Sequence, residues 1–147
     1  MVDLIKIYDD IKSAFANDAE LMKLISGNLD SPKVFIGRDM PAVFISPAIQ
    51  IVGMTDVLNY PFDYSNVVLR TNVYAMGNVN GTIPYSNLSA ILNRVYDILK
   101  LHSFNLSAIK VFNFSAETRD SDATQDLNYA GTMKRYLMGM EWRLIAV

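Results

Sequence analysis

The alternation of apolar and polar residues predicts a strand followed by a helix in the middle of the chain. Over Asn66–Met76, apolar side chains occur on both faces of the predicted strand, which is typical of a strand inside a sheet. Over Pro84–His102, apolar residues recur at the spacing of one helical face: Leu88, Ile91, Leu92, Val95, Ile98 and Leu99. We expect this helix to pack across the sheet.

Two further helices are predicted near the N-terminus. Apolar residues at helical spacing indicate the first one: Leu4, Ile7, Tyr8, Ile11 and Phe15. Asn17 and Glu20 have the spacing of a capping box, which predicts a second, short helix from about Asp18 to Ser26. Gly27 is expected to end it.

Short strands are predicted in the stretch that follows. They are Val34–Ile36, Ala42–Ile45 and Ile49–Val52, each bounded by Gly, Pro or Asp. Pro41 and Pro47 flank the middle strand. Because proline has no N–H to donate to a ladder, we expect that strand to lie at an edge or to begin and end at those points.

The remaining segments predict loops and two more strands. Asp56–Tyr64 is aromatic without a helical or strand period, which indicates a loop, and Ile109–Phe114 reads as a strand. The strongly polar run Glu117–Asp126 predicts a connection, and Thr132–Ala146 predicts a long final strand. At about 50 Å if unbroken, that strand should either bend at Gly139 or project beyond the sheet.

This order of elements predicts an α+β fold. We expect a single domain over residues 1–147, with a mixed, mostly antiparallel sheet, the amphipathic helix across one face and the short helix pair at the N-terminus. The chain is 51% hydrophobic and 19% charged with a net charge of −2, which argues against disorder and against direct binding of nucleic acid. No stretch has the length of a membrane span and no signal peptide precedes the first helix, so a soluble, intracellular product is expected.

Candidate chemistry is sparse. The chain has no cysteine, and His102 is its only histidine, at the end of the predicted helix where it can interact with the helix dipole. Asp120 begins a run that starts like a calcium loop, but Gln125 and Gly131 stand where that loop needs Gly and Glu. We therefore predict no catalytic, cofactor-binding or metal-binding residues. A small enzyme with a cryptic site, for instance one that uses His102, is the least favoured alternative.

The amount of apolar surface suggests that copies of the chain cover one another. The two long strands are mostly apolar on both sides, which exceeds what one helix can cover. Subunits that close head-to-tail into a ring use two different patches per chain, and strand edges are convenient for joining them. A homo-oligomer is therefore the preferred interpretation.

The order of segments resembles the phage tail-completion and tail-terminator proteins. The resemblance begins with Ala19–Gly27, Val34–Gly37 and the strand between Pro41 and Pro47. It continues with a long strand at Val67–Met76, an amphipathic helix at Tyr85–Lys100, and a polar loop with the Arg119-Asp120 pair before the last strand. It covers nearly the whole chain as an order of elements rather than as a motif.

The resemblance implies a structural role in the virion. Members of that family form a ring, commonly hexameric, that caps the tail tube, ends tail polymerisation and joins the tail to the head. The implied partners are other copies of the chain, the tail-tube protein and the neck or connector protein, at the head-proximal end of a tail assembled in the host cytoplasm. A neck or head-completion adaptor is the alternative. The aromatic and polar loops supply the candidate interface residues: Asp56, Tyr60, Phe62, Tyr64, Glu117, Arg119, Asp120, Asp122, Asp126 and Arg135.

Overall fold

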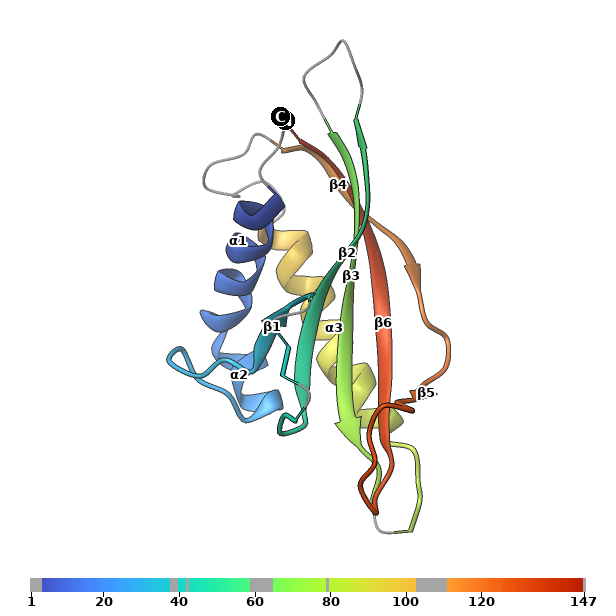
Figure 1. Ribbon diagram of the computed structural model, residues 1–147. Helices are drawn as coiled ribbons and strands as arrows, with labels where there is room; N and C mark the ends of the chain where they lie inside the picture. The colour runs from blue at the N-terminus through green and yellow to red at the C-terminus, as the bar shows by residue number, and fades with distance from the viewer. Residues whose placement is uncertain are drawn as a thin grey trace.

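The computed structural model describes residues 4–37, 40–41, 43–58, 65–78, 80–102 and 111–146. The helices in this part of the chain are α1 (Leu4–Ala16), α2 (Ala19–Ile25) and α3 (Tyr85–His102). The strands are β1 (Val34–Ile36), β2 (Ala48–Leu58), β3 (Ser65–Met76), β4 (Val111–Arg119), β5 (Thr124–Gln125) and β6 (Arg135–Ala146). The predicted single-domain α+β fold is confirmed (Figure 1).

The strands form one mixed sheet in the order β1-β2-β3-β6-β4, and β5 pairs with the first part of β6. Only β1 and β2 are parallel, and the other pairs are antiparallel. Strands β3 and β6 pair along their whole length, from Ser65 with Ala146 to Met76 with Arg135. The final strand therefore does not project beyond the sheet, which was one of the two alternatives that its length suggested, and its pairing with β3 continues without a register shift through Gly139.

The hydrophobic core lies between the helices and one face of the sheet (Figure 1). Alternate residues of β3 and β6 face it, as the period of two requires, and α3 contributes its predicted apolar stripe. Trp142 of β6 is only 1% exposed, and its ring lies 5.8 Å from that of Tyr96 on α3. The prediction that this helix packs across the sheet is confirmed.

The N-cap of the second helix, α2, lies one residue after the predicted cap. Asp18 rather than Asn17 is the N-cap, because its carboxylate accepts the backbone N–H of Leu21 at 2.8 Å. The Asn17 side chain instead donates to the carbonyl of Ser13. Arg94 of α3 donates to both carboxylate oxygens of Asp18, at 3.0 and 2.5 Å, which joins α3 to the start of α2.

Four strand predictions need correction. Residues 43–47 form no strand, because Pro41 and Pro47 leave too few donors for a ladder. Strand β2 continues through Asp56–Leu58, which was predicted as a loop, since these residues pair with β3. Part of the predicted polar connection is also sheet, because β4 extends to Arg119 and β5 forms a two-residue pair with β6. The last strand begins at Arg135, not at Thr132.

Candidate functional site

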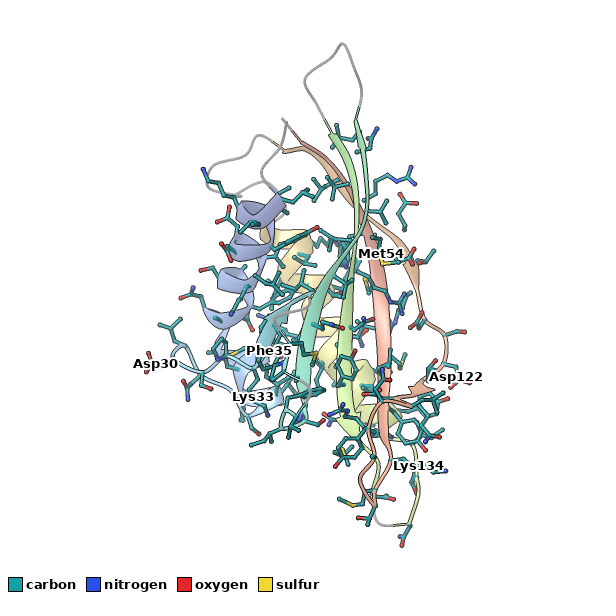
Figure 2. All side chains as sticks on the ribbon, in the orientation of Figure 1. Asp30, Lys33, Phe35, Met54, Asp122 and Lys134 are labelled. Atoms are coloured by element: carbon teal, nitrogen blue, oxygen red, sulfur yellow. The ribbon has the colours of Figure 1, made fainter. Side chains whose placement is uncertain are left out.

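Polar side chains gather on the face of the sheet that the helices leave open (Figure 2). They come from the positions that alternate with the core positions of the same strands: Gln50 of β2, Arg70, Asn72 and Tyr74 of β3, and Glu141 of β6. Cross-strand register brings them together, because Gln50 lies opposite Asn72 and Arg70 lies opposite Glu141. We call this set the open-face network.

Arg70 is the centre of this network. Its guanidinium forms an ion pair with Asp120, lies 3.7 Å from a carboxylate oxygen of Glu141, and donates from Nε to Oδ1 of Asn72 at 2.8 Å. Asp120 is held in turn by Gly139, because its carboxylate accepts the Gly139 N–H and its own N–H donates to the Gly139 carbonyl, both at 2.9 Å. Asp120, which directly follows β4, is thereby bound to both β6 and β3.

Gly139 leaves the space that the Arg70 side chain occupies. A Cβ atom at residue 139 would lie 2.5 Å from both Nη2 of Arg70 and Oδ1 of Asn72. A glycine inside a strand often marks such a close approach. Gly139 was interpreted from sequence as a possible bend, and its actual role is to let Arg70 cross β6 toward Asp120.

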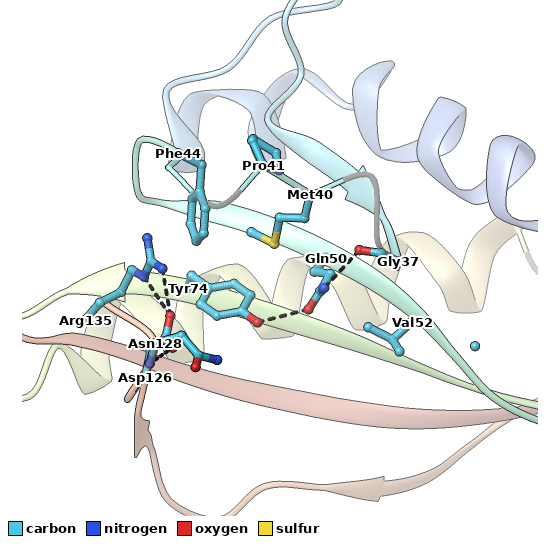
Figure 3. A pocket seen from close by; sticks show the side chains of 11 residues that line it. Gly37, Met40, Pro41, Phe44, Gln50, Val52, Tyr74, Asp126, Asn128 and Arg135 are labelled. Atoms are coloured by element: carbon cyan, nitrogen blue, oxygen red, sulfur yellow. Dashed lines mark hydrogen bonds and ion pairs between the residues drawn. The ribbon is translucent and has the colours of Figure 1, made fainter. Parts of the chain in front are cut away.

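The network continues toward the segment after β1 (Figure 3). The Tyr74 hydroxyl donates to Oε1 of Gln50 at 2.9 Å, and Nε2 of Gln50 donates to the carbonyl of Gly37 at 3.1 Å. Asn72 approaches the same Oε1 at 3.4 Å. Burial raises the pKa of the Tyr74 hydroxyl above its usual value, and the negative charge of Asp126 adds to the rise.

A buried ion pair closes the other end of the open face. Nε and Nη2 of Arg135 donate to Oδ2 of Asp126 at 2.9 and 2.8 Å, and the two side chains are 3% and 7% exposed. The guanidinium carbon lies 3.8 Å from the ring centre of Phe44 and 4.5 Å from that of Tyr129. Such cation–π contacts are strong when they are shielded from water. They join the segment after β1 to the loop between β5 and β6.

A pocket of about 430 Å³ lies between these two segments and the sheet (Figure 3). Its lining residues are Gly37, Met40, Pro41, Phe44, Gln50, Val52, Gly53, Tyr74, Asp126, Asn128 and Arg135. The pocket therefore combines aromatic and aliphatic walls with two side-chain amides, a phenol and a buried ion pair.

The structure separates the predicted interface residues into groups. Asp120, Asp126 and Arg135 belong to the ion pairs above, so the last two are buried rather than presented to a partner. Glu117 and Arg119 are exposed. Glu117 lies 3.6 Å from Arg143, and Arg119 donates to Asn93 at 2.9 Å. These placements leave their role at an interface a prediction.

The remaining predicted interface residues give less information. Asp122 is exposed, and its carboxylate accepts the N–H of Ala123. The backbone of Asp56 pairs with that of Val67 in the sheet. Tyr60, Phe62 and Tyr64 lie outside the described residues.

Sequence reasoning missed the centre of the network and the most exposed apolar residues. Arg70 stood out only as a charged residue in a central strand, which is itself a signal that a partner charge lies nearby. Val43, Ile45 and Leu127 are 88%, 81% and 85% exposed, which the predicted strand and polar connection did not indicate. Val43 and Ile45 flank Phe44 along the chain, and Leu127 follows Asp126.

Within the described ranges, no three or more His, Cys, Asp or Glu residues are grouped closely enough to hold a metal ion. No helix in the same ranges combines the length and the apolar character needed to cross a membrane. His102 is the last residue of α3, as predicted.

No known protein family matches the chain, and no curated protein matches it either.

Proposed function

We propose that this protein is a structural subunit of a phage tail that assembles into a ring, caps the tail tube and forms the interface between tail and head. The observation that carries the proposal is a pair of unlike strand edges at opposite sides of one sheet. Each edge is long enough to pair with another strand, and no described strand pairs with β2 beyond Ile51 on that side or with the outer side of β4.

The first edge belongs to β2. Strand β1 pairs only with Ile49–Ile51, so among the described residues no strand pairs with the stretch from Val52 to Leu58 on that side. The second edge belongs to β4, which ends the strand order and pairs only with β6. Unsatisfied backbone N–H and C=O groups along both edges favour addition of a further strand.

The directions of the strands suit a head-to-tail contact. Strands β2, β3, β6 and β4 are antiparallel in succession, so β2 and β4 run in opposite directions. If copies are related by rotation about an axis along the strands, β4 of one copy meets β2 of the next in antiparallel orientation. A contact between two different surfaces repeats from copy to copy and closes into a ring when the rotation permits.

The charged residues of the open face support a structural role over a chemical one. Asp120 is bound by Arg70 and Gly139, and Asp126 is bound by Arg135. Their charges therefore stabilise the loop between β4 and β6 in one arrangement. The exposed side chains of Val43 and Leu127 lie outside these networks and offer apolar contact area to a neighbouring ring.

The mass of the protein in solution tests whether the chain forms a ring. Light scattering coupled to size exclusion, over a concentration series, should give an integral multiple of the 16.5 kDa subunit, and negative-stain images should show a central opening. Met54→Lys places a charge at the register shift of β2, beside the free edge, and should abolish the ring. Met133→Lys is the matched control, because Met133 is similarly exposed but follows β5. A chain that stays monomeric, also when mixed with tail-tube protein, would contradict the proposal.

Phage particles test the position of the ring. Loss of a tail terminator should give tails of uncontrolled length or tails without heads. Tails of normal length would instead assign the protein to the neck.

A further inference from the structure

We propose that the pocket between the segment after β1 and the sheet binds a planar, uncharged carboxamide. This site does not depend on the ring, because its lining residues belong to one copy of the chain. Figure 3 shows its construction: Phe44, Pro41 and Met40 lie above it, and Gln50 and Tyr74 form the floor. Its volume of about 430 Å³ lies in the range of small-molecule sites.

The walls favour a flat ligand. Phe44 and Tyr74 rings lie 5.3 Å apart in an edge-on arrangement, and the thioether of Met40 adapts to the shape of a neighbour. Arg135 adds a guanidinium plane that already lies against the Phe44 ring. An aromatic or amide plane can stack on these groups without moving the sheet.

Several polar groups that line the pocket can form further hydrogen bonds. Nε and Nη2 of Arg135 are used by Asp126, whereas Nη1 has no partner within the described residues. Gln50 uses one of its two amide hydrogens on the carbonyl of Gly37, which leaves the second. The Tyr74 oxygen donates to Gln50 and keeps its lone pairs, and Asn128 brings a further amide to the rim.

These free donors and acceptors suit both the carbonyl oxygen and the NH2 group of a carboxamide. Its carbonyl oxygen can accept from Nη1 of Arg135 or from Nε2 of Gln50, and its NH2 group can donate to the Tyr74 oxygen or to the Asn128 amide. A purely apolar ligand would displace water from these groups without replacing its hydrogen bonds, which costs affinity.

The charge balance excludes ionic ligands. Asp126 and Arg135 neutralise one another, and no other lining residue carries a charge. A carboxylate or a cation would lose its hydration without gaining an unpaired counter-charge. A carboxamide forms the same planar contacts and carries no net charge. The source is either a free small molecule or an Asn or Gln side chain of a partner protein.

Three ligands of nearly equal shape test the charge requirement. Benzamide, benzoate and benzamidinium are titrated into the 15N-labelled protein, and amide shifts report the site. With benzamide, the amide shifts of Gln50, Tyr74 and Asn128 should change until they reach a plateau. The dissociation constant should be about 1 mM, as expected for so small a ligand. The two ions should bind about tenfold more weakly or not at all. N-acetylglutamine methylamide distinguishes the sources, because tighter binding than benzamide assigns the pocket to a protein side chain.

Variants test whether the pocket itself is the site. Tyr74→Phe keeps the ring and leaves Asn72 bound to Gln50, so the chain should fold, and benzamide binding should weaken about fivefold. Asn128→Ala removes an exposed rim amide and should weaken it less. Arg143→Gln, on the same face but outside the lining, is the control and should have no effect. Shifts that do not saturate, equal binding of the three ligands, or unchanged binding to Tyr74→Phe would each overturn the proposal.

Discussion

Arg135 and Asp126 form their ion pair through a single carboxylate oxygen, Oδ2, which accepts from both Nε and Nη2 of the guanidinium. The second oxygen, Oδ1, accepts the backbone N–H of Asn128 at 3.0 Å. Asp126 therefore positions its own loop with one oxygen and binds β6 with the other. The pair holds the loop after β5 against the open face of the sheet.

Breaking this pair should destabilise the protein strongly. Asp126→Asn leaves the Arg135 charge, and Arg135→Met leaves the Asp126 charge, buried without its counter-charge, so we expect the free energy of unfolding to fall by about 3–5 kcal/mol in either variant. The double variant Asp126→Asn/Arg135→Met should lose less than the sum of the single variants. Urea unfolding measures this, with the fluorescence of Trp142, the only tryptophan, as the signal. Losses below about 1 kcal/mol would mean that water solvates the pair.

Replacement of Gly139 by alanine should disturb the open-face network. The new methyl group would overlap Arg70 and Asn72, so Arg70 must leave Asp120, and we expect a loss of about 1–3 kcal/mol. In an Arg70→Ala background the same substitution should cost less, because the Arg70 side chain is gone and the Asn72 side chain, which no longer accepts from Arg70, can move aside. A double-mutant cycle followed by urea unfolding measures the coupling. Equal costs in both backgrounds would assign the effect to the strand backbone instead.

Two substitutions at Asp18 should separate its roles as cap and as ion-pair partner. Asp18→Asn keeps an acceptor for the N–H of Leu21 but removes the charge that binds Arg94, so a loss of about 1 kcal/mol is expected. Asp18→Ala removes both and should cost about 2 kcal/mol or more. Thermal unfolding checks the order. Asn17→Ala is the control, and it should have little effect because Asn17 does not cap α2.

Tyr74 should make stability fall at alkaline pH. Its pKa is raised in the folded state above the usual value of 10.0, so above that pH the unfolded chain loses the proton first. Stability due to Tyr74 is complete below pH 10.0 and decreases as the pH rises toward the folded pKa. Lys33, whose pKa burial lowers, acts in the opposite direction as the pH approaches 10.5.

A comparison of two chains isolates the contribution of Tyr74. Urea unfolding between pH 8 and 11 (about the range of tyrosine and lysine titration) should show a steeper alkaline loss for the wild type than for Tyr74→Phe. Lys33 is present in both chains, so its effect cancels in the difference. Parallel curves would mean that Tyr74 is equally hydrated in the folded and unfolded states.

The parts of the fold that sequence predicted correctly are those with long periodic patterns. The apolar stripe of α3 and alternate residues of β3 face the core. Burial of one face therefore produces the period that the sequence displays. The segment Val43–Ile45 shows the limit of that argument. Its residues are apolar and Pro41 and Pro47 stand on either side of it, yet only Phe44 turns inward, to Arg135, because the prolines cannot donate to a ladder.

The site was harder to predict because it depends on register. Asp126 and Arg135 were chosen for their charge, but their pairing requires the chain to reverse between β5, a strand of two residues, and β6. Gln50 and Asn72 meet because β2 and β3 pair in one register, and a shift by one residue would move them to opposite faces. Neither relation has a local signal along the chain.

The place of β6 in the sheet has a consequence for biosynthesis. It lies between β3 and β4, although both precede it in the chain, so the sheet stays split until residues 135–146 have left the ribosome. Until then both β3 and β4 expose edges that attract other nascent chains. We therefore expect mRNAs truncated shortly before codon 135 to give insoluble products. Chaperones that bind the nascent chain until β6 has been synthesised should raise the yield of folded protein.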